Sequence, residues 1–165
     1  MTADARTRTI TWSDPAATSS GMDGRTGLEF LEALAAGSIA APPIMSLIDA
    51  KLVSVGPGEA VFSCEPAEFH YNPIGSVHGG VVATLLDSAA GCAVQTTLPA
   101  GVGYTSLDLS VKYLRSVRAD SGTITCTGRV VHAGRRTALA QADLRDASGR
   151  LLATATSSCV LLPAG

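Results

Sequence analysis

The stretch NPIGSVHGGVVATLLDSAAG, residues 72–91, decides the fold of this chain. From Gly79 onward it carries small and apolar residues at nearly every position, so a helix formed there has no wide polar face. A helix of that kind is stable in water only when other elements cover most of its sides. We therefore expect a long central helix in the core, entered through the triplet His78-Gly79-Gly80.

One carboxylate, Asp87, interrupts this apolar run. No lysine or arginine stands three or four residues away on the same helix, where it could compensate the charge. An unpaired carboxylate is costly to bury, and carboxylates that are kept buried are often functional. The alternative is that Asp87 points into solvent from an exposed strip that it shares with Thr84 and Ser88.

Strand-like segments lie on both sides of the central helix. Before it, Pro42 and Pro43 stop any helix, and residues 44–65 predict a strand, a Gly-Pro-Gly turn and a second strand. Alternation is strictest from Thr105 to Tyr113, which predicts one shared apolar face. Four such consecutive runs predict an antiparallel meander. They are separated by turn residues and lie at 104–115, 121–134, 135–149 and 150–162.

The N-terminal part of the chain divides at about residue 25. Residues 1–25 are rich in Thr, Ser, Ala, Asp and Gly without periodicity, which predicts a mobile arm. Residues 25–36 place leucines at helical spacing before Gly37, which predicts a short amphipathic helix. A sheet that curls around the long central helix would hide it, giving an α+β architecture of two layers.

Composition narrows the classes of partner. Hydrophobic residues make up 46% of the 165 residues and charged residues only 16%, so we expect another subunit to cover part of the apolar surface. A formal net charge of −2 provides no basic field for nucleic acid or anionic lipid. The chain shows neither a signal-peptide pattern nor an apolar run of membrane-spanning length. These features favour a cytoplasmic protein that binds neither nucleic acid nor membrane.

The four cysteines, Cys64, Cys92, Cys126 and Cys159, are scattered along the chain. They form no CxxC pair, and no histidine stands at metal-ligand spacing from them. We expect buried, reduced thiols and no metal site.

The central motif resembles a known enzyme family. NPIG at 72–75, HGG at 78–80, Asp87 eight residues after the first glycine of HGG, and SLDLSVKYLRS at 106–116 are similar to hotdog-fold acyl-CoA thioesterases of the phenylacetate-pathway, PaaI-like type. The similarity covers about residues 45–162. It implies a hotdog fold, in which an antiparallel sheet wraps around a long central helix. It also implies hydrolysis of acyl-CoA without a metal or redox cofactor.

The resemblance implies roles for particular residues. Gly79 would donate its backbone N–H to the thioester carbonyl oxygen, where negative charge develops. Asp87 would act as a general base on water or as a nucleophile, and the sequence leaves both roles open. Asn72 would orient the carbonyl or the water, Ser106 would orient the water, and His78 would cap the helix or fix the loop. The alternatives are ordinary turn residues and an ordinary strand serine.

Distance along the helix predicts a dimer. Gly79 and Asp87 are eight residues apart, and at about 1.5 Å per residue that is roughly 12 Å, too far for both to reach one thioester. An antiparallel copy of the helix, related by a two-fold axis, would bring the partner's Asp87 to Gly79. We expect a homodimer with a shared active site that pairs again into a dimer of dimers. Each subunit would be a single hotdog domain, residues 26–165, preceded by the arm.

Two basic segments resemble coenzyme A contacts of the family. The segment HAGRRTALA contains Arg135, Arg136 and Thr137, while Arg115 and Arg118 lie in the other. Guanidinium groups bind phosphate oxygens through paired hydrogen bonds. Solvated arginines at strand ends are the alternative.

Hydrolysis of an aryl or medium-chain acyl-CoA to a free acid and coenzyme A is the leading hypothesis. A non-catalytic acyl-CoA binding or sensing module is the second, although residues 1–25 are too short for a DNA-binding reader domain. A hotdog dehydratase acting on 3-hydroxyacyl thioesters is the third, but such enzymes pair a histidine with an acid at another spacing. The position of Asp87 favours hydrolysis.

Overall fold

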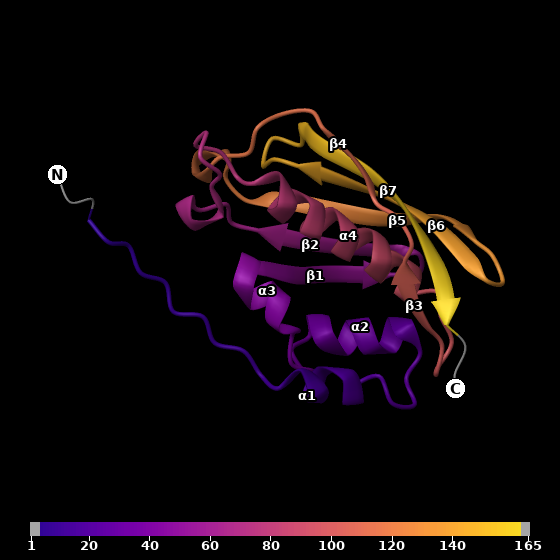
Figure 1. The fold of residues 1–165 in the computed structure, drawn as a ribbon. Helices are drawn as coiled ribbons and strands as arrows, with labels where there is room; N and C mark the ends of the chain where they lie inside the picture. Colours follow the sequence, from indigo (N-terminus) through magenta and orange to yellow (C-terminus); the bar gives the residue numbers. More distant parts are fainter. Residues whose placement is uncertain (1–3, 163–165) are drawn as a thin grey trace.

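The computed structural model describes residues 4–162, in which an antiparallel sheet curls around a long helix, α4, at Gly79–Gln95 (Figure 1). The spatial order of the seven-stranded sheet is β1-β2-β5-β6-β7-β3, and β4 also pairs with β7. The predicted α+β wrapping of the sheet around the central helix is confirmed. The strands are β1 Ala50–Gly56, β2 Glu59–Cys64, β3 Gly103–Ser106, β4 Ser110–Tyr113, β5 Ile124–Ala133, β6 Thr137–Arg145 and β7 Leu151–Leu162.

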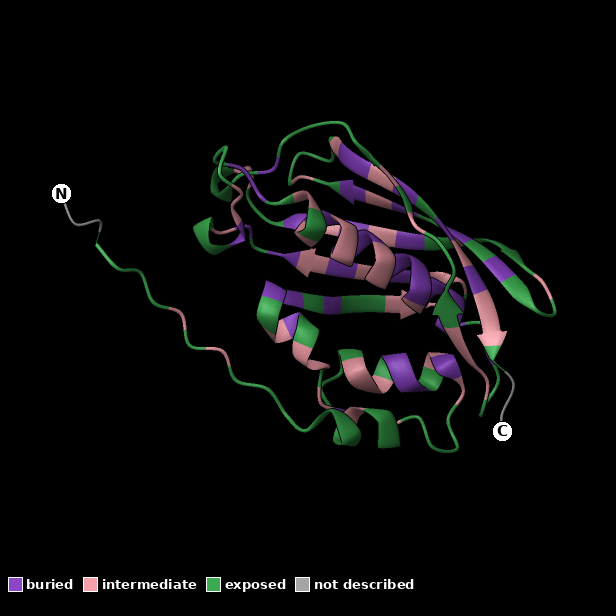
Figure 2. Cartoon of the chain, in the orientation of Figure 1, coloured by how far each residue is buried: buried purple, intermediate pink, exposed green. Residues whose placement is uncertain are grey.

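Helix α4 fills the centre of the core. Figure 2 shows it buried or half-buried over nearly all of its length, and Leu86 and Ala89 are fully buried. Small residues let the sheet approach closely. A Cβ on Gly128 of β5 would lie 2.0 Å from the Ala89 carbonyl oxygen, so only glycine permits this crossing.

Three helices precede the sheet: α1 Pro15–Ser20, α2 Gly27–Ala35 and α3 Pro43–Ile48. Helix α2 confirms the predicted amphipathic helix and begins with a capping box formed by Thr26 and Glu29. Helix α3 corrects the prediction of a strand over residues 44–48. Pro43 lies in the first turn of a helix, where its missing N–H costs no hydrogen bond, so the proline pair starts this helix instead of preventing it.

The strand predicted over residues 104–115 is wrong as a continuous element. Asp108 interrupts it, because its carbonyl accepts a hydrogen bond from Ser157 Oγ and its carboxylate accepts one from Ser158 N. The resulting strands β3 and β4 both pair with β7, and neither pairs with β5. The predicted meander of four strands is therefore reduced to β5, β6 and β7.

The edge formed by β3, β4 and the residues around them is apolar and exposed. Leu107, Tyr113 and Leu114 are 60%, 56% and 50% exposed, whereas Leu109 and Val111 are half-buried against the core, so one chain covers only part of the apolar face predicted here. An open sheet edge with large apolar side chains is a surface on which another chain can pack.

The segment before residue 26 contains α1 and contacts the body through Arg8. The Arg8 guanidinium donates to the Ser46 and Leu47 carbonyls, each at 2.9 Å, and stacks over the Phe69 ring at 3.8 Å from its centroid. Trp12 is 64% exposed. Mobility of the arm and the division at residue 25 stay predictions, and residues 1–3 and 163–165 lie outside the described chain.

The cysteines of the described chain are free thiols. Cys64, Cys126 and Cys159 are buried and Cys92 is half-buried. Burial raises the pKa of the Cys92 thiol to about 12, with Asp87 adding to the effect, so this thiol stays protonated at neutral pH. Across residues 4–162, no helix combines the length and apolar character needed to cross a membrane.

Candidate active site

The N-terminal end of α4 presents a backbone donor. His78 is the N-cap, and its Nδ1 accepts a hydrogen bond from Gly80 N at 2.9 Å. The His78 backbone N donates to the His70 carbonyl at 2.8 Å, which ties the helix start to the preceding loop. The Gly79 N–H has no hydrogen-bond acceptor among residues 4–162. His78 therefore takes the capping position, and the Gly79 N–H is left at the positive end of the helix dipole.

The loop that carries Asn72 is folded by its own hydrogen bonds. Asn72 Oδ1 accepts from the backbone N of Ile74 at 3.1 Å and of Ser76 at 3.3 Å, while Nδ2 donates to Ser76 Oγ at 3.2 Å. Gly75 closes the turn at φ +77°, a conformation that favours glycine. Asn72 is thus a turn residue, and it also lines the neighbouring cavity.

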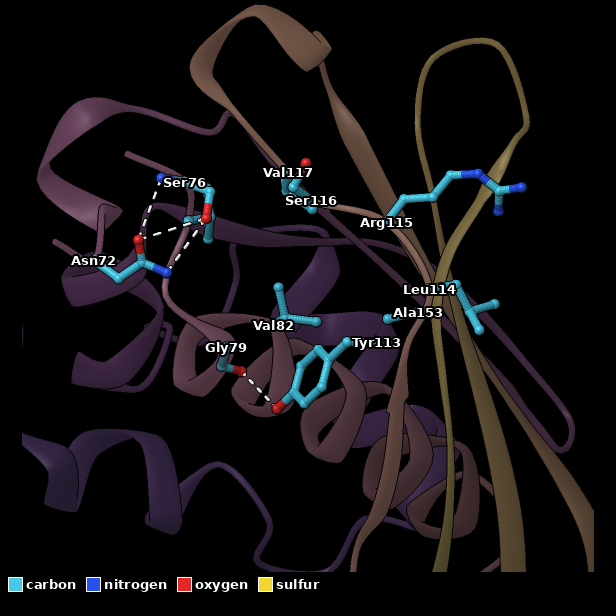
Figure 3. Close-up of a pocket in the computed structure, with 11 residues that line it drawn as sticks. Asn72, Ser76, Gly79, Val82, Tyr113, Leu114, Arg115, Ser116, Val117 and Ala153 are labelled. Carbon is cyan, nitrogen blue, oxygen red and sulfur yellow. Dashed lines mark hydrogen bonds between the residues drawn. The ribbon is translucent and has the colours of Figure 1, made fainter. Parts of the chain in front are cut away.

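A cavity of about 310 Å³ lies against this end of α4 (Figure 3). Asn72, Gly79, Tyr113 and Arg115 all line it. The Tyr113 hydroxyl donates to the Gly79 carbonyl at 3.0 Å, so β4 contacts the first residue of the helix. Sequence reasoning does not find Tyr113 as a site residue, because its only signal is its place in an alternating strand.

Asp87 lies in the middle of α4 beside β3. Its half-buried carboxylate accepts a hydrogen bond from Ser106 Oγ, at 3.0 Å from Oδ1. Within the described chain no lysine, arginine or histidine forms an ion pair with it. The structure therefore brings Asp87 and Ser106 together, and the carboxylate is neither sealed in the core nor fully exposed.

One chain keeps the two groups of predicted residues apart. Asn72 and Gly79 line the cavity, whereas Asp87 and Ser106 do not. The rise of the helix separates Gly79 from Asp87 by roughly 12 Å. A single chain thus places a backbone N–H without an acceptor in the described residues at one point and a carboxylate without an ion pair in them at another.

Comparison with known proteins identifies the family. A family model described as the thioesterase superfamily matches residues 74–153. Acyl-coenzyme A thioesterase 13 from Homo sapiens is 33% identical over 103 residues, which are 62% of this chain and 72% of that protein. The chain belongs to the thioesterase superfamily.

Solved structures share the fold of this thioesterase. The E. coli PaaI protein from the phenylacetic acid degradation operon matches with a TM-score of 0.67 at 21% identity, over 73% of this chain and 85% of that chain. The protein smu.793 from Streptococcus mutans, solved bound to acetyl CoA, matches with a TM-score of 0.64 at 28% identity, over 70% and 90% of the two chains. The resemblance to PaaI-like hotdog proteins is confirmed, and the protein is a thioester hydrolase.

The arginines predicted to contact coenzyme A lie in two groups, one near each end of α4. Arg135 and Arg136 are exposed in the β5–β6 hairpin and line a second cavity of about 530 Å³, next to the residues that follow α4. Thr137 begins β6 beside them. Arg115 lines the first cavity, and Arg118 is exposed a few residues further along the chain. In one chain the two basic groups are therefore not brought together.

The described part of the thioesterase contains no group of three or more His, Cys, Asp or Glu residues that could hold a metal ion. Activity without a cofactor stays a prediction.

Proposed function

We propose that this thioesterase hydrolyses acyl-CoA to a free acid and coenzyme A at a site shared between two copies of the chain. The observation that carries the proposal is a Gly79 N–H that has no acceptor in the described part of the chain, at a cavity that Asp87 does not line. A two-fold axis that sets α4 antiparallel beside its copy would bring the partner's Asp87 to that cavity. The exposed apolar edge at Leu107 and Tyr113 provides a surface for such pairing.

In the proposed reaction, the thioester carbonyl oxygen accepts a hydrogen bond from the Gly79 N–H. Negative charge on this oxygen grows as the tetrahedral intermediate forms, so the donor and the helix dipole stabilise the intermediate more than the substrate. Asn72 Nδ2 carries two N–H groups, and one donates to Ser76 Oγ. The second would orient the carbonyl.

We assign the partner's Asp87 as the general base. Oδ1 accepts from Ser106, which leaves Oδ2 to take a proton from water while the water oxygen attacks the carbonyl carbon. The Ser106 hydroxyl keeps lone pairs that can accept a hydrogen bond from the same water. A carboxylate that itself attacked the thioester would not need a water molecule held by Ser106 in the first step of the reaction. Collapse of the intermediate expels the coenzyme A thiolate, which takes the proton from Asp87. The carboxylic acid then releases its own proton to solvent and leaves as a carboxylate.

The antiparallel dimer would also bring the basic segments together. Reversing α4 places its C-terminal end, with Arg135 and Arg136, near the N-terminal end of the other copy, where Arg115 lies. Guanidinium groups from both subunits would then face the phosphates of one coenzyme A. Thr137 and Arg118 would complete these contacts. For the acyl part of the substrate we propose an aryl or medium-chain group.

Thiol release from a panel of aryl- and alkyl-CoA thioesters tests the activity. We expect turnover of at least one member, with kcat/KM above about 10⁴ M⁻¹s⁻¹. Tight binding of acyl-CoA without thiol release would contradict hydrolysis and support the sensing module. Loss of water from a 3-hydroxyacyl-CoA would support the dehydratase.

Subunit complementation tests the shared site. Asp87→Asn removes the base, and Gly79→Val fills the cavity beside the N–H, so each homodimer should be inactive. A mixed dimer of the two variants would contain one intact site, made of Gly79 from one chain and Asp87 from the other. Statistical reassembly should restore about a quarter of wild-type activity, because about half of the dimers are mixed and each has one intact site. No recovery would mean that each chain carries its own site.

A single turnover in ¹⁸O-labelled water tests the role of Asp87. A general base directs water to the acyl carbon, so the first acid released carries the label. A nucleophilic Asp87, regenerated by water attack on its own carboxyl carbon, would place the label in the enzyme and release unlabelled acid.

A further inference from the structure

Strand β3 contacts α4 through two side chains that point the same way. Tyr104 and Ser106 are two positions apart in the strand, so they share a face, and Asp87 and Gly91 are four positions apart in the helix and do likewise. Ser106 hydrogen-bonds to Asp87, while Tyr104 packs on Gly91. The proposed catalytic pair therefore lies about one helical turn from the contact between Tyr104 and Gly91.

Gly91 forms a notch that fits the Tyr104 ring. A Cβ at position 91 would lie 2.3 Å from Tyr104 Oη and 2.8 Å and 2.9 Å from Cε2 and Cζ. Non-bonded carbon atoms pack at about 3.5–4.0 Å, so any side chain here would displace the ring. Glycine is otherwise a poor residue for a helix interior. The close approach of Tyr104 accounts for its presence.

Tyr104 acts in this contact as a neutral packing group. It packs against the hydrophobic core although β3 lies at the sheet edge. Burial raises the pKa of the Tyr104 phenol, and the nearby Asp87 carboxylate adds to the shift. The hydroxyl therefore stays protonated across the working pH range.

Strand β3 needs an anchor of this kind. It has four residues and, among residues 4–162, pairs only with β7, and Ser106 at its end is exposed to water that competes for Asp87. A small shift of β3 would break the 3.0 Å hydrogen bond between Ser106 and Asp87. We propose that Tyr104, seated in the Gly91 notch, is a positioning residue that holds Ser106 on the Asp87 carboxylate. This inference rests on the proposed function, because it assumes that Asp87 and Ser106 serve the reaction.

A double-mutant cycle on kcat tests the inference. Tyr104→Ala should lower kcat about tenfold and leave KM for acyl-CoA within about twofold, and Ser106→Ala should act similarly. The double variant should be no worse than Ser106→Ala alone, because Tyr104 acts through Ser106. Tyr104→Phe keeps the ring and should stay within about twofold of wild type. Thr105→Ala, on the opposite face of β3, is the matched control and should not change kcat.

Three kinetic outcomes would overturn the inference: full activity in Tyr104→Ala, a loss in the double variant equal to the product of the single losses, or a loss in Tyr104→Phe as large as in Tyr104→Ala. A crystal structure of Tyr104→Ala gives a test that does not depend on turnover. We expect Ser106 Oγ to lie more than about 3.5 Å from Asp87 Oδ1, and an unchanged hydrogen bond would contradict the proposal. Gly91→Ala, which displaces the ring without removing it, should lengthen the same distance. Failure of the wild type to cleave any acyl-CoA would refute the proposed function and leave this structural test to decide the role of Tyr104.

Discussion

The N-terminal end of α4 and its middle carry the two halves of the proposed site, and they are held in place by different means. At the N-terminal end, Asn72 and Gly79 belong to one continuous stretch whose turn and cap are closed by hydrogen bonds between close neighbours. In the middle, Asp87 meets Ser106 only because β3 packs on α4. The first half is therefore assembled locally, whereas the second depends on the closure of the sheet and, in the proposed reaction, on a second subunit.

The largest expected effect comes from the half of the proposed site in the middle of α4, where Asp87 would accept the proton. Asp87→Asn keeps the shape but removes the proton acceptor, so kcat should fall by at least about 100-fold while coenzyme A binding and dimerisation persist. The melting temperature should stay the same or rise, because a half-buried carboxylate without a cation is replaced by a neutral amide. Steady-state kinetics and thermal melts measure both. Asp23→Asn, the same change at an exposed position, is the control, and near wild-type turnover in Asp87→Asn would remove the catalytic assignment.

The next effect separates the folding role of Asn72 from its chemical role. Asn72→Ala should lower kcat about tenfold and also lower the melting temperature, since the backbone N–H groups of Ile74 and Ser76 lose their acceptor. Asn72→Asp keeps that acceptor and should melt near the wild-type temperature. Its kcat should still fall, because a carboxylate has no N–H to donate to the carbonyl. Wild-type kcat in Asn72→Asp would show that this residue serves the turn alone.

A smaller effect is expected from the basic hairpin at the far end of α4. Replacing Arg135 and Arg136 together by Ala should raise KM for acyl-CoA about fivefold and change kcat by less than about twofold, because phosphate contacts bind substrate and transition state alike. A short acyl thioester without the nucleotide should be unaffected. Arg129→Ala, at an exposed pair with Glu59, is the matched control. Equal losses with both substrates would assign the hairpin arginines to the fold.

The smallest effect concerns how stability depends on pH in the loop that leads to the N-terminal end of α4. His70 is buried, its ring bonds to Ala67 N and to the Ile48 carbonyl, and burial lowers its pKa from the ordinary value. A depressed histidine pKa means that the folded state prefers the neutral ring. This contribution to stability is therefore present above about pH 6.5 and is lost as the pH falls through the folded-state pKa.

Thermal melts across that range should show a modest acid destabilisation that is absent in His70→Asn. Hydrogen exchange should place the loosening in the loop at residues 67–78 and leave β3 protected. Equal acid sensitivity in the variant would mean that another group is responsible.

Much of the structure that forms between close neighbours in the chain could be predicted from the sequence. The apolar run from Gly79 predicts a buried helix, HGG predicts its start, and the leucine spacing predicts α2, because helical hydrogen bonds and periodicity involve residues only a few positions apart. The proline pair shows the limit even here. Pro43 is compatible both with a break and with a helix start, and the contacts of Met45 and Ile48 with the core favour the helix.

The sequence by itself therefore determined the central helix and the α+β class, and it predicted the residues proposed for both halves of the site. Only the tertiary structure decided that Asp108 would divide one strand into β3 and β4, that both would cross to β7, and that Tyr104 and Tyr113 would meet Gly91 and Gly79. Strand pairing joins residues about 50 positions apart, as between Ser106 and Cys159, and its outcome depends on how all the strands compete to cover one helix. No local pattern encodes that competition, so the contact between Ser106 and Asp87 is decided only in the folded chain.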